Sequence, residues 1–200
     1  DVSVMSAAGQ DQPVKLLAAV LWRDAGAIAD ALRRLAGLWG EIDIQGPDRP
    51  FDATDYYEKE MGAGLHRRIV SFTELVSSGS LALRKLEAAG DEDALRGPLG
   101  RRVNIDPGYL DVHKVVLASF KPGAPKIHLG RGVHADIVCR YSKGKFQPLE
   151  WSFGDFRRGA YDEELAAIRA RYKGQLVAVT SSSAPAGSPA ASGPPAASPR

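Results

Sequence analysis

An almost unbroken apolar run, Val14 to Trp22, constrains the fold of this chain more than any other segment. Only Lys15 interrupts it, so both alternating faces of an extended strand would be apolar. That pattern is typical of a strand at the centre of a sheet that is covered on both sides. We therefore expect two buried sets of side chains on a central strand, Leu17, Ala19 and Leu21 on one side and Leu16, Ala18 and Val20 on the other.

The segments after this strand alternate between helical and extended patterns. Asp24 is a suitable helix cap, and apolar residues then recur at helical spacing from Ile28 to Leu38, with Gly40 as a stop. Ile42 to Ile44 alternates with polar residues as a half-buried strand does, and Leu65 to Phe72 is apolar at its centre. The order up to this point is therefore strand, helix, strand, strand.

A second helix is expected from about Ser80 to Leu95, capped by Ser80. Its buried face should carry Leu83, Leu86 and Ala89. A short strand from Arg101 to Ile105 follows, and Asp106-Pro-Gly-Tyr109 is expected to form a turn, because proline presets φ and glycine tolerates positive φ.

The order β-α-β-β-α-β through Ile105 predicts an α+β fold with a ferredoxin-like, split βαβ core. A mixed sheet of another topology is the alternative. Three more strands joined by glycine-containing hairpins would extend the antiparallel sheet, at Lys126–Leu129, Val133–Tyr141 and Lys145–Leu149. An amphipathic helix from Asp162 to Leu176 would follow.

The two ends of the chain differ in composition from its centre. From Thr180 to Arg200 the sequence lacks aromatic and large aliphatic residues. Such a segment cannot bury enough apolar surface to offset the entropy of ordering. Residues 180–200 are therefore predicted to be disordered, residues 1–12 likewise, and a single domain would span residues 13–179.

The composition excludes several classes of protein. The single cysteine, Cys139, rules out an intramolecular disulfide framework and a multi-cysteine zinc site. No apolar run approaches the ~18–20 residues that span a bilayer, and the start of the chain has no leader pattern. A formal net charge of +2 leaves no broad nucleic-acid footprint. We expect a cytoplasmic protein without a membrane or nucleic-acid partner, and the sequence leaves its oligomeric state open.

A polar segment from Phe51 to Gly62 contains two aspartates, two tyrosines and two glutamates. It has neither a helical nor a strand period, so it is expected to be a surface loop that carries function. Spaced carboxylates such as Asp52 and Asp55 could hold a hard cation, but capping and salt bridging are the simpler alternative and we assign no metal. Its aromatic residues should fold the loop over one end of the sheet.

Arg102, Asn104 and Asp106 would share one face of the short strand before the expected turn. A guanidinium beside an amide and a carboxylate can recognise an anionic ligand. The alternative is that Asn104 and Asp106 satisfy only the backbone of their own turn. If the polar loop meets this row in a shared cleft, the ligand-binding residues are Asp52, Thr54, Asp55, Tyr57, Arg68, Arg102, Asn104, Asp106 and Tyr109.

Several of these motifs also indicate a family. Residues 51–62, Phe-Asp-x-Thr-Asp-Tyr-Tyr-Glu-Lys-Glu-Met-Gly, resemble a signature of small bacterial proteins catalogued as domain of unknown function 4416, and so do residues 101–110 and 144–151. The similarity covers about Lys15 to Leu176, and it implies a shared domain and a shared site but no activity. Some members are described as GTP-binding, yet this sequence has no G-x-x-x-x-G-K-[ST] phosphate loop.

Three functions are compatible with the sequence. The first is a binding module for a small anionic, nucleotide- or phosphate-like ligand, with the polar loop as a lid. The second is an enzyme of unassigned reaction type in which Asp55 or Asp106 acts as an acid or base or holds a divalent cation. The third is a scaffold that binds a partner through an exposed apolar patch. The sequence identifies no cofactor.

Overall fold

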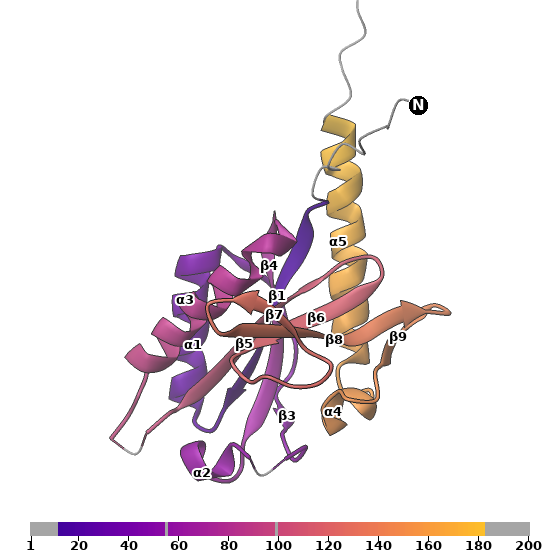
Figure 1. Cartoon of the computed structure of the whole chain (residues 1–200). Coiled ribbons are helices and arrows are strands. Elements are labelled where there is room, and N and C mark those ends of the chain that lie inside the picture. Colours follow the sequence, from indigo (N-terminus) through magenta and orange to yellow (C-terminus); the bar gives the residue numbers. More distant parts are fainter. Residues whose placement is uncertain (1–11, 55, 99, 183–200) are drawn as a thin grey trace, which may run out of the picture.

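The computed structural model describes residues 12–54, 56–98 and 100–182, which form one large sheet with helices on both faces (Figure 1). The strands are β1 (Val14–Trp22), β2 (Ile42–Gln45), β3 (Arg49–Pro50), β4 (His66–Val76), β5 (Val103–Leu110), β6 (Lys114–Ser119), β7 (Ile127–Gly130), β8 (Val133–Ser142) and β9 (Lys145–Pro148). The helices are α1 (Ala25–Trp39), α2 (Glu58–Met61), α3 (Leu81–Ala94), α4 (Gly154–Arg157) and α5 (Asp162–Ser182), with a 3-10 turn at Ser78–Ser80.

All strand pairings in the sheet are antiparallel, in the order β2-β4-β1-β5-β6-β8-β7. The short strand β3 lies beside β4, and β9 lies beside β8. The prediction of an α+β fold with a large antiparallel sheet and a C-terminal helix is therefore confirmed, and the sheet has nine strands.

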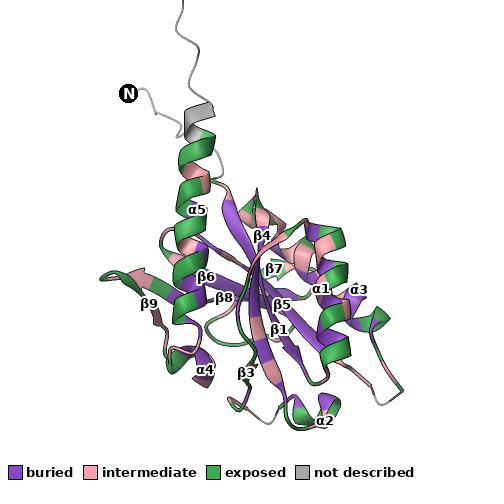
Figure 2. Ribbon diagram, turned by 180° about the vertical axis from the view of Figure 1, so that it is seen from behind, coloured by how far each residue is buried: buried purple, intermediate pink, exposed green. Residues whose placement is uncertain are grey.

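Strand β1 lies between β4 and β5, and every residue in it is buried. Leu16, Ala18 and Val20 pack with α1 and α3 on one face of the sheet. Leu17 and Ala19 pack with α5 on the opposite face, and the helices are seen on these two sides in Figure 2. The predicted division of this strand into two buried sets is confirmed.

The first helix begins and ends where the sequence predicts. The Asp24 carboxylate accepts a hydrogen bond from the Ala27 amide, which satisfies one of the free donors at the start of α1. Gly40, at φ 88°, ends it in the left-handed region that glycine tolerates. The hairpins before β8 and β9 also form as expected, with positive φ at Arg131 and Lys143.

The second predicted helix exists, but its buried face was wrongly assigned. Ser80 makes no capping hydrogen bond, and Leu83 is 51% exposed. The face that α3 buries carries Lys85 and Glu92 beside its apolar residues. These charged side chains face inward because the edge of β5 beneath them offers unpaired backbone groups.

The turn predicted at Asp106-Pro-Gly-Tyr109 is wrong, because these residues lie within β5, where Pro107 is opposite Ala18 of β1. Strand β6 pairs with β5 only from Gly108 onward, so no ladder bond is missing at Pro107. Gly108 is required for close approach, since a Cβ there would lie 2.1 Å from the Val116 carbonyl oxygen.

Helix α5 continues to Ser182 and so enters the segment from residue 180 that was predicted to be disordered. The remaining residues of that segment, and residues 1–11 of the predicted N-terminal one, lie outside the described residues. None of the helices in the described part of the chain is long and apolar enough to cross a bilayer.

Candidate functional site

The candidate site is built where β5 and β6 part. Residues 103–107 of β5 have no partner in β6, because the pairing of these strands is restricted to residues 108–110. Side chains of α3 take the place of the missing strand at Ile105. The Glu92 carboxylate accepts a hydrogen bond from the Ile105 amide at 2.7 Å, and the Lys85 ammonium donates to the Ile105 carbonyl at 2.6 Å.

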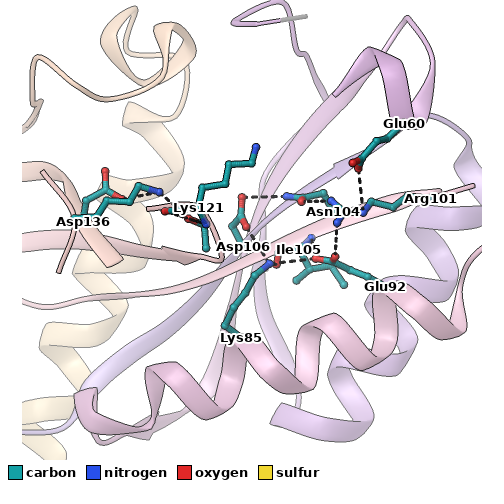
Figure 3. A network of polar contacts seen from close by, with 11 residues as sticks. Glu60, Lys85, Glu92, Arg101, Asn104, Ile105, Asp106, Lys121 and Asp136 are labelled. Atoms are coloured by element: carbon teal, nitrogen blue, oxygen red, sulfur yellow. Dashed lines mark hydrogen bonds and ion pairs between the residues drawn. The ribbon is translucent and has the colours of Figure 1, made fainter. Parts of the chain in front are cut away.

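These two side chains belong to a closed polar ring (Figure 3). Lys85 Nζ lies 3.1 Å from Asp106 Oδ1 and 3.2 Å from Glu92 Oε1. Asn104 donates to the second oxygen of Asp106 at 3.0 Å and accepts a hydrogen bond from Arg101 at 2.7 Å. Arg101 closes the ring through Glu92 at 3.5 Å. Four of these side chains are buried and Arg101 is partly exposed, and their mutual contacts fix them in one arrangement.

Asp106 is the buried carboxylate at the centre of this ring. Burial alone would raise its pKa, but Lys85, Arg67 and the hydrogen bond from Asn104 hold the pKa below its usual value. Both of its oxygens already have partners within the chain. Asp106 is therefore a fixed negative charge rather than a free proton acceptor.

Lys121 approaches the same region from the end of β6. Its ammonium lies 3.3 Å from the ring centre of Tyr56 and 4.2 Å from that of Tyr57. Burial lowers the pKa of Lys121 to about 8, with Asp106 opposing this shift and Lys126 and Arg101 adding to it. The residues around Asp106 thus include an amine that titrates close to neutral pH.

A small hollow of about 100 Å³ connects Asp106 with a second carboxylate, Asp136 of β8. Lys126 lies 3.6 Å from Asp136 and donates a hydrogen bond to Ser119 at 2.6 Å. Burial raises the pKa of Asp136 above its usual value. The two carboxyl groups of this hollow therefore differ in proton affinity, one held ionised and the other shifted toward the neutral acid.

A larger polar cleft, of about 350 Å³, lies between α2 and residues 97–102. Arg23, Arg101 and Arg102 line it, together with Asp24, which caps α1, and the acidic side chains of α2. The polar loop is anchored to the domain by Phe51 and Tyr57, which are 7% and 3% exposed and pack together in one apolar cluster.

The structure brings some of the predicted ligand-binding residues together. Asn104 and Asp106 are hydrogen-bonded to each other, and the charge of Asp106 acts on the buried Tyr57 hydroxyl, whose pKa is raised chiefly by burial. The predicted row with Arg102 does not form. Arg102 precedes β5, so strand alternation does not apply to it, and its guanidinium binds Asp24 at 2.6 Å. Arg101 is instead the arginine that contacts Asn104.

The other predicted residues are separate from this ring. Arg68 pairs with Asp48 at 2.7 Å, Asp52 pairs with Arg158, and Thr54 accepts a hydrogen bond from the Tyr56 amide at 3.1 Å. Tyr109 lines an apolar hollow of about 420 Å³ that also includes Ile127, Leu129 and Trp151. Asp55 lies outside the described residues, so its distance from Asp106 is not defined.

Sequence reasoning missed Lys85, Glu92, Arg101 and Lys121. Only the first two left a usable signal, because charged residues seven positions apart share one helix face. Their partner, the backbone of Ile105, is twenty and thirteen residues further along the chain and shows no pattern of its own. Lys121 depends on where Tyr56 and Tyr57 fold, which no local pattern indicates.

A metal ion at this site would need carboxylate oxygens such as those of Asp106 and Glu92 as ligands. Among the residues that the structure describes, no group of three or more His, Cys, Asp or Glu side chains is arranged to hold one. The carboxylates of the ring are each engaged by lysine, arginine or amide donors.

Comparison with known proteins places this architecture in a family. No curated protein and no solved structure matches the chain. One family model, described as Domain of unknown function (DUF4416), matches residues 12–172. These residues run from just before β1 to the middle of α5 and include the polar ring, Lys121, the hollow beside Asp136 and the arginine-lined cleft. The chain therefore belongs to the DUF4416 family.

Proposed function

We propose that this protein is a binding module for a small anionic ligand with nucleotide- or phosphate-like groups, held between α2 and residues 97–102. The observation that carries the proposal is the convergence of Arg23, Arg101 and Arg102 on one cleft of about 350 Å³. Guanidinium groups bind carboxylate and phosphate oxygens through paired hydrogen bonds. The volume lies within the range of small-molecule sites, which begins at roughly 300 Å³.

Arg101 is held by Asn104, Glu60 and Glu92, but the state of Arg23 and Arg102 supports this role. Arg23 is exposed and makes one long hydrogen bond, 3.4 Å, to the Met61 carbonyl. Arg102 is held by Asp24 in a pair whose side chains are 35% and 45% exposed. An anion that enters the cleft would share or replace Asp24 as the partner of Arg102. The exchange is inexpensive because a solvent-exposed ion pair is worth only ~0–1 kcal/mol.

Helix α2 would act as the lid over the ligand. Its apolar side packs in the cluster of Phe51, Tyr57, Met61, Leu65 and Leu21, and its cleft side is held by the exposed ion pair of Glu60 with Arg101 at 3.7 Å. Its outward residues, Glu58, Lys59 and Glu60, are exposed and line the cleft.

We also propose that part of the sheet, with α1 and α3, is a ferredoxin-like core. Strands β1, β2, β4 and β5 lie in the order β2-β4-β1-β5, and α1 and α3 pack on one face of them. The antiparallel pairings and the helical crossovers fit a ferredoxin-like, split βαβ core. Strands β6 to β9 would then be an extension that creates the gap beside β5.

A thermal-shift series tests the binding proposal. The wild-type chain is heated with ATP, GTP, inorganic phosphate or a sugar phosphate, because a ligand that binds only the native state raises the melting temperature. At least one anion should raise the Tm of wild type and of Arg140→Ala, an exposed arginine outside the cleft. Arg23→Ala and Arg102→Ala should fold and lose the shift. Absence of any shift in wild type, or its retention in both cleft variants, would refute the proposal.

A second candidate function, general acid–base catalysis, is favoured by the opposite pKa shifts of Asp106 and Asp136 in one hollow. In acid–base catalysis, two neighbouring carboxyl groups commonly have pKa values that their environments push apart, so that one is a proton donor and the other is ionised. Asp136 would be the acid. Asp136→Asn should abolish turnover in a screen of ester, phosphate and glycoside substrates while leaving the anion-induced Tm shift intact. Turnover that survives in Asp136→Asn would dismiss this role.

A further inference from the structure

Lys121 has surroundings unlike those of the other lysines in the described chain. Its ammonium lies against the faces of Tyr56 and Tyr57, with 3.3 and 4.2 Å to the two ring centres. No carboxylate or carbonyl in the described residues accepts a hydrogen bond from its Nζ. By contrast, the half-buried Lys114 and Lys126 each pair with an aspartate. Ring faces attract an ammonium, but they do not replace the hydrogen bonds to water that burial removes.

The charged groups that face Lys121 do not compensate for that loss. Asp106 is the negative charge that acts most strongly on Lys121, but its oxygens are already bound by Lys85 and Asn104. Glu60 adds a second negative charge, whereas Lys126 and Arg101 add positive ones. Figure 3 shows the Lys121 side chain rising beside Asp106 and directed away from the ring. Among the described residues, the ammonium is thus half-buried, without a paired carboxylate, and next to other cations.

We propose that Lys121 is a carbonyl-reactive amine that forms a Schiff base with a small aldehyde or ketone. The neutral amine attacks the carbonyl carbon and forms the C–N bond of a carbinolamine. The carbonyl oxygen then leaves as water with the two protons of the amine nitrogen, which gives an imine. No oxidant or reductant is required, and hydrolysis reverses the step. This inference concerns a different group from the arginine cleft and does not depend on ligand binding there.

The protonation state of Lys121 makes the reaction selective near neutral pH. With a pKa of about 8, roughly one tenth of the Lys121 side chains are neutral at pH 7. An ordinary lysine, with a pKa of ~10.4, is neutral in only roughly 0.04% of molecules at that pH. The advantage of Lys121 therefore shrinks as pH rises, because the other lysines also lose their protons.

Reductive trapping on the full chain tests the inference. The protein is incubated at pH 7 with propionaldehyde, a neutral carbonyl probe, and cyanoborohydride, and the labelled lysines are identified by peptide mass spectrometry. Lys121 should be labelled at least about tenfold faster than the exposed Lys143 of the β8–β9 hairpin, and the ratio should approach one near pH 10. Lys121→Arg should lose this label and keep the labels on all other lysines.

A parallel experiment with pyridoxal 5′-phosphate separates amine reactivity from anion capture. Selective labelling of Lys121 by both probes supports the inference. Selective labelling by pyridoxal phosphate alone would overturn it, because recruitment of the phosphate by nearby cations would then explain the result. Equal rates at Lys121 and Lys143 with propionaldehyde at pH 7 would overturn it as well. The melting temperature of Lys121→Arg confirms that the variant is folded.

Discussion

Arg67 of β4 and Asp155 of α4 form an ion pair with 2.7 Å between Nη1 and Oδ2, and their side chains are only 2% and 1% exposed. The Tyr161 hydroxyl donates to the same carboxylate oxygen at 2.6 Å. The guanidinium also lies 4.2 Å from the ring centre of Phe51. This pair therefore joins the sheet, the segment before α5 and the start of the polar loop in one buried contact.

Asp155→Ala should destabilise the fold by ~3–5 kcal/mol, because it leaves the Arg67 guanidinium charged and buried without a partner. Urea unfolding followed by circular dichroism measures the change. Arg158→Ala is the matched control, since it breaks the solvent-exposed pair with Asp52 and should cost no more than ~1 kcal/mol. Equal losses in the two variants would show that the burial of the Arg67 pair has no energetic consequence.

The parts of the fold that were predictable from sequence are those set by local patterns. Strand β1 is apolar on both faces, and α1 carries its own cap and stop at Asp24 and Gly40. Strand β5 was predicted wrongly because Pro107 and Gly108 favour a turn locally. In the sheet, Pro107 lies where no N–H donor is needed, and Gly108 lies where there is no room for a side chain.

The candidate site was less predictable because its contacts are long-range. Lys85 and Glu92 are buried only because β5 and β6 part beside α3, a fact that depends on the register of both strands. Arg101 rather than Arg102 contacts Asn104, since β5 begins at Val103 and the alternation of side chains cannot be extended back to residue 102.

Acidification should destabilise the protein partly through Asp106. Burial would raise its pKa, but Lys85, Arg67 and Asn104 hold the native pKa below the unfolded value of ~3.9. A carboxylate of this kind stabilises the native state above the unfolded pKa. That stability is lost as pH falls through the lower native pKa. The free energy of unfolding, measured in urea from about pH 7 down to about pH 2, should therefore fall below about pH 4.

The variant Asp106→Asn isolates this contribution. It should be less stable than wild type at neutral pH, because Lys85 loses its carboxylate partner, and its stability should vary less with pH in the acid range. Asp93→Asn is the control, an exposed carboxylate paired with Arg96, and should follow the wild-type profile. A wild-type slope in Asp106→Asn would assign the acid sensitivity to other groups.

Deletion of residues 183–200 should leave the melting temperature within about 2 °C of the full chain, since a loss of ~1 kcal/mol would shift it by ~2–4 °C. The reason is composition, because this segment has no aromatic or large aliphatic residue with which to cover a core. Calorimetry on both lengths is the measurement. A drop of 5 °C or more would mean that the segment contributes contacts to the folded domain.

Two glycines provide opposite tests of the packing around β5. Gly108→Ala should destabilise the fold, because the new Cβ would lie 2.1 Å from the Val116 carbonyl oxygen and 2.6 Å from Leu117 Cδ2. The backbone of β6 cannot retreat from this contact without breaking its pairing at Leu117.

Gly37→Ala, on the exposed side of α1 with no atom near its Cβ, should instead stabilise the protein by ~0.5–1 kcal/mol through higher helix propensity. Urea unfolding of both variants gives the comparison. A Gly108→Ala protein as stable as wild type would mean that β5 and β6 are not paired in the register described, and the gap that holds Asp106 and Lys85 would lose its structural basis.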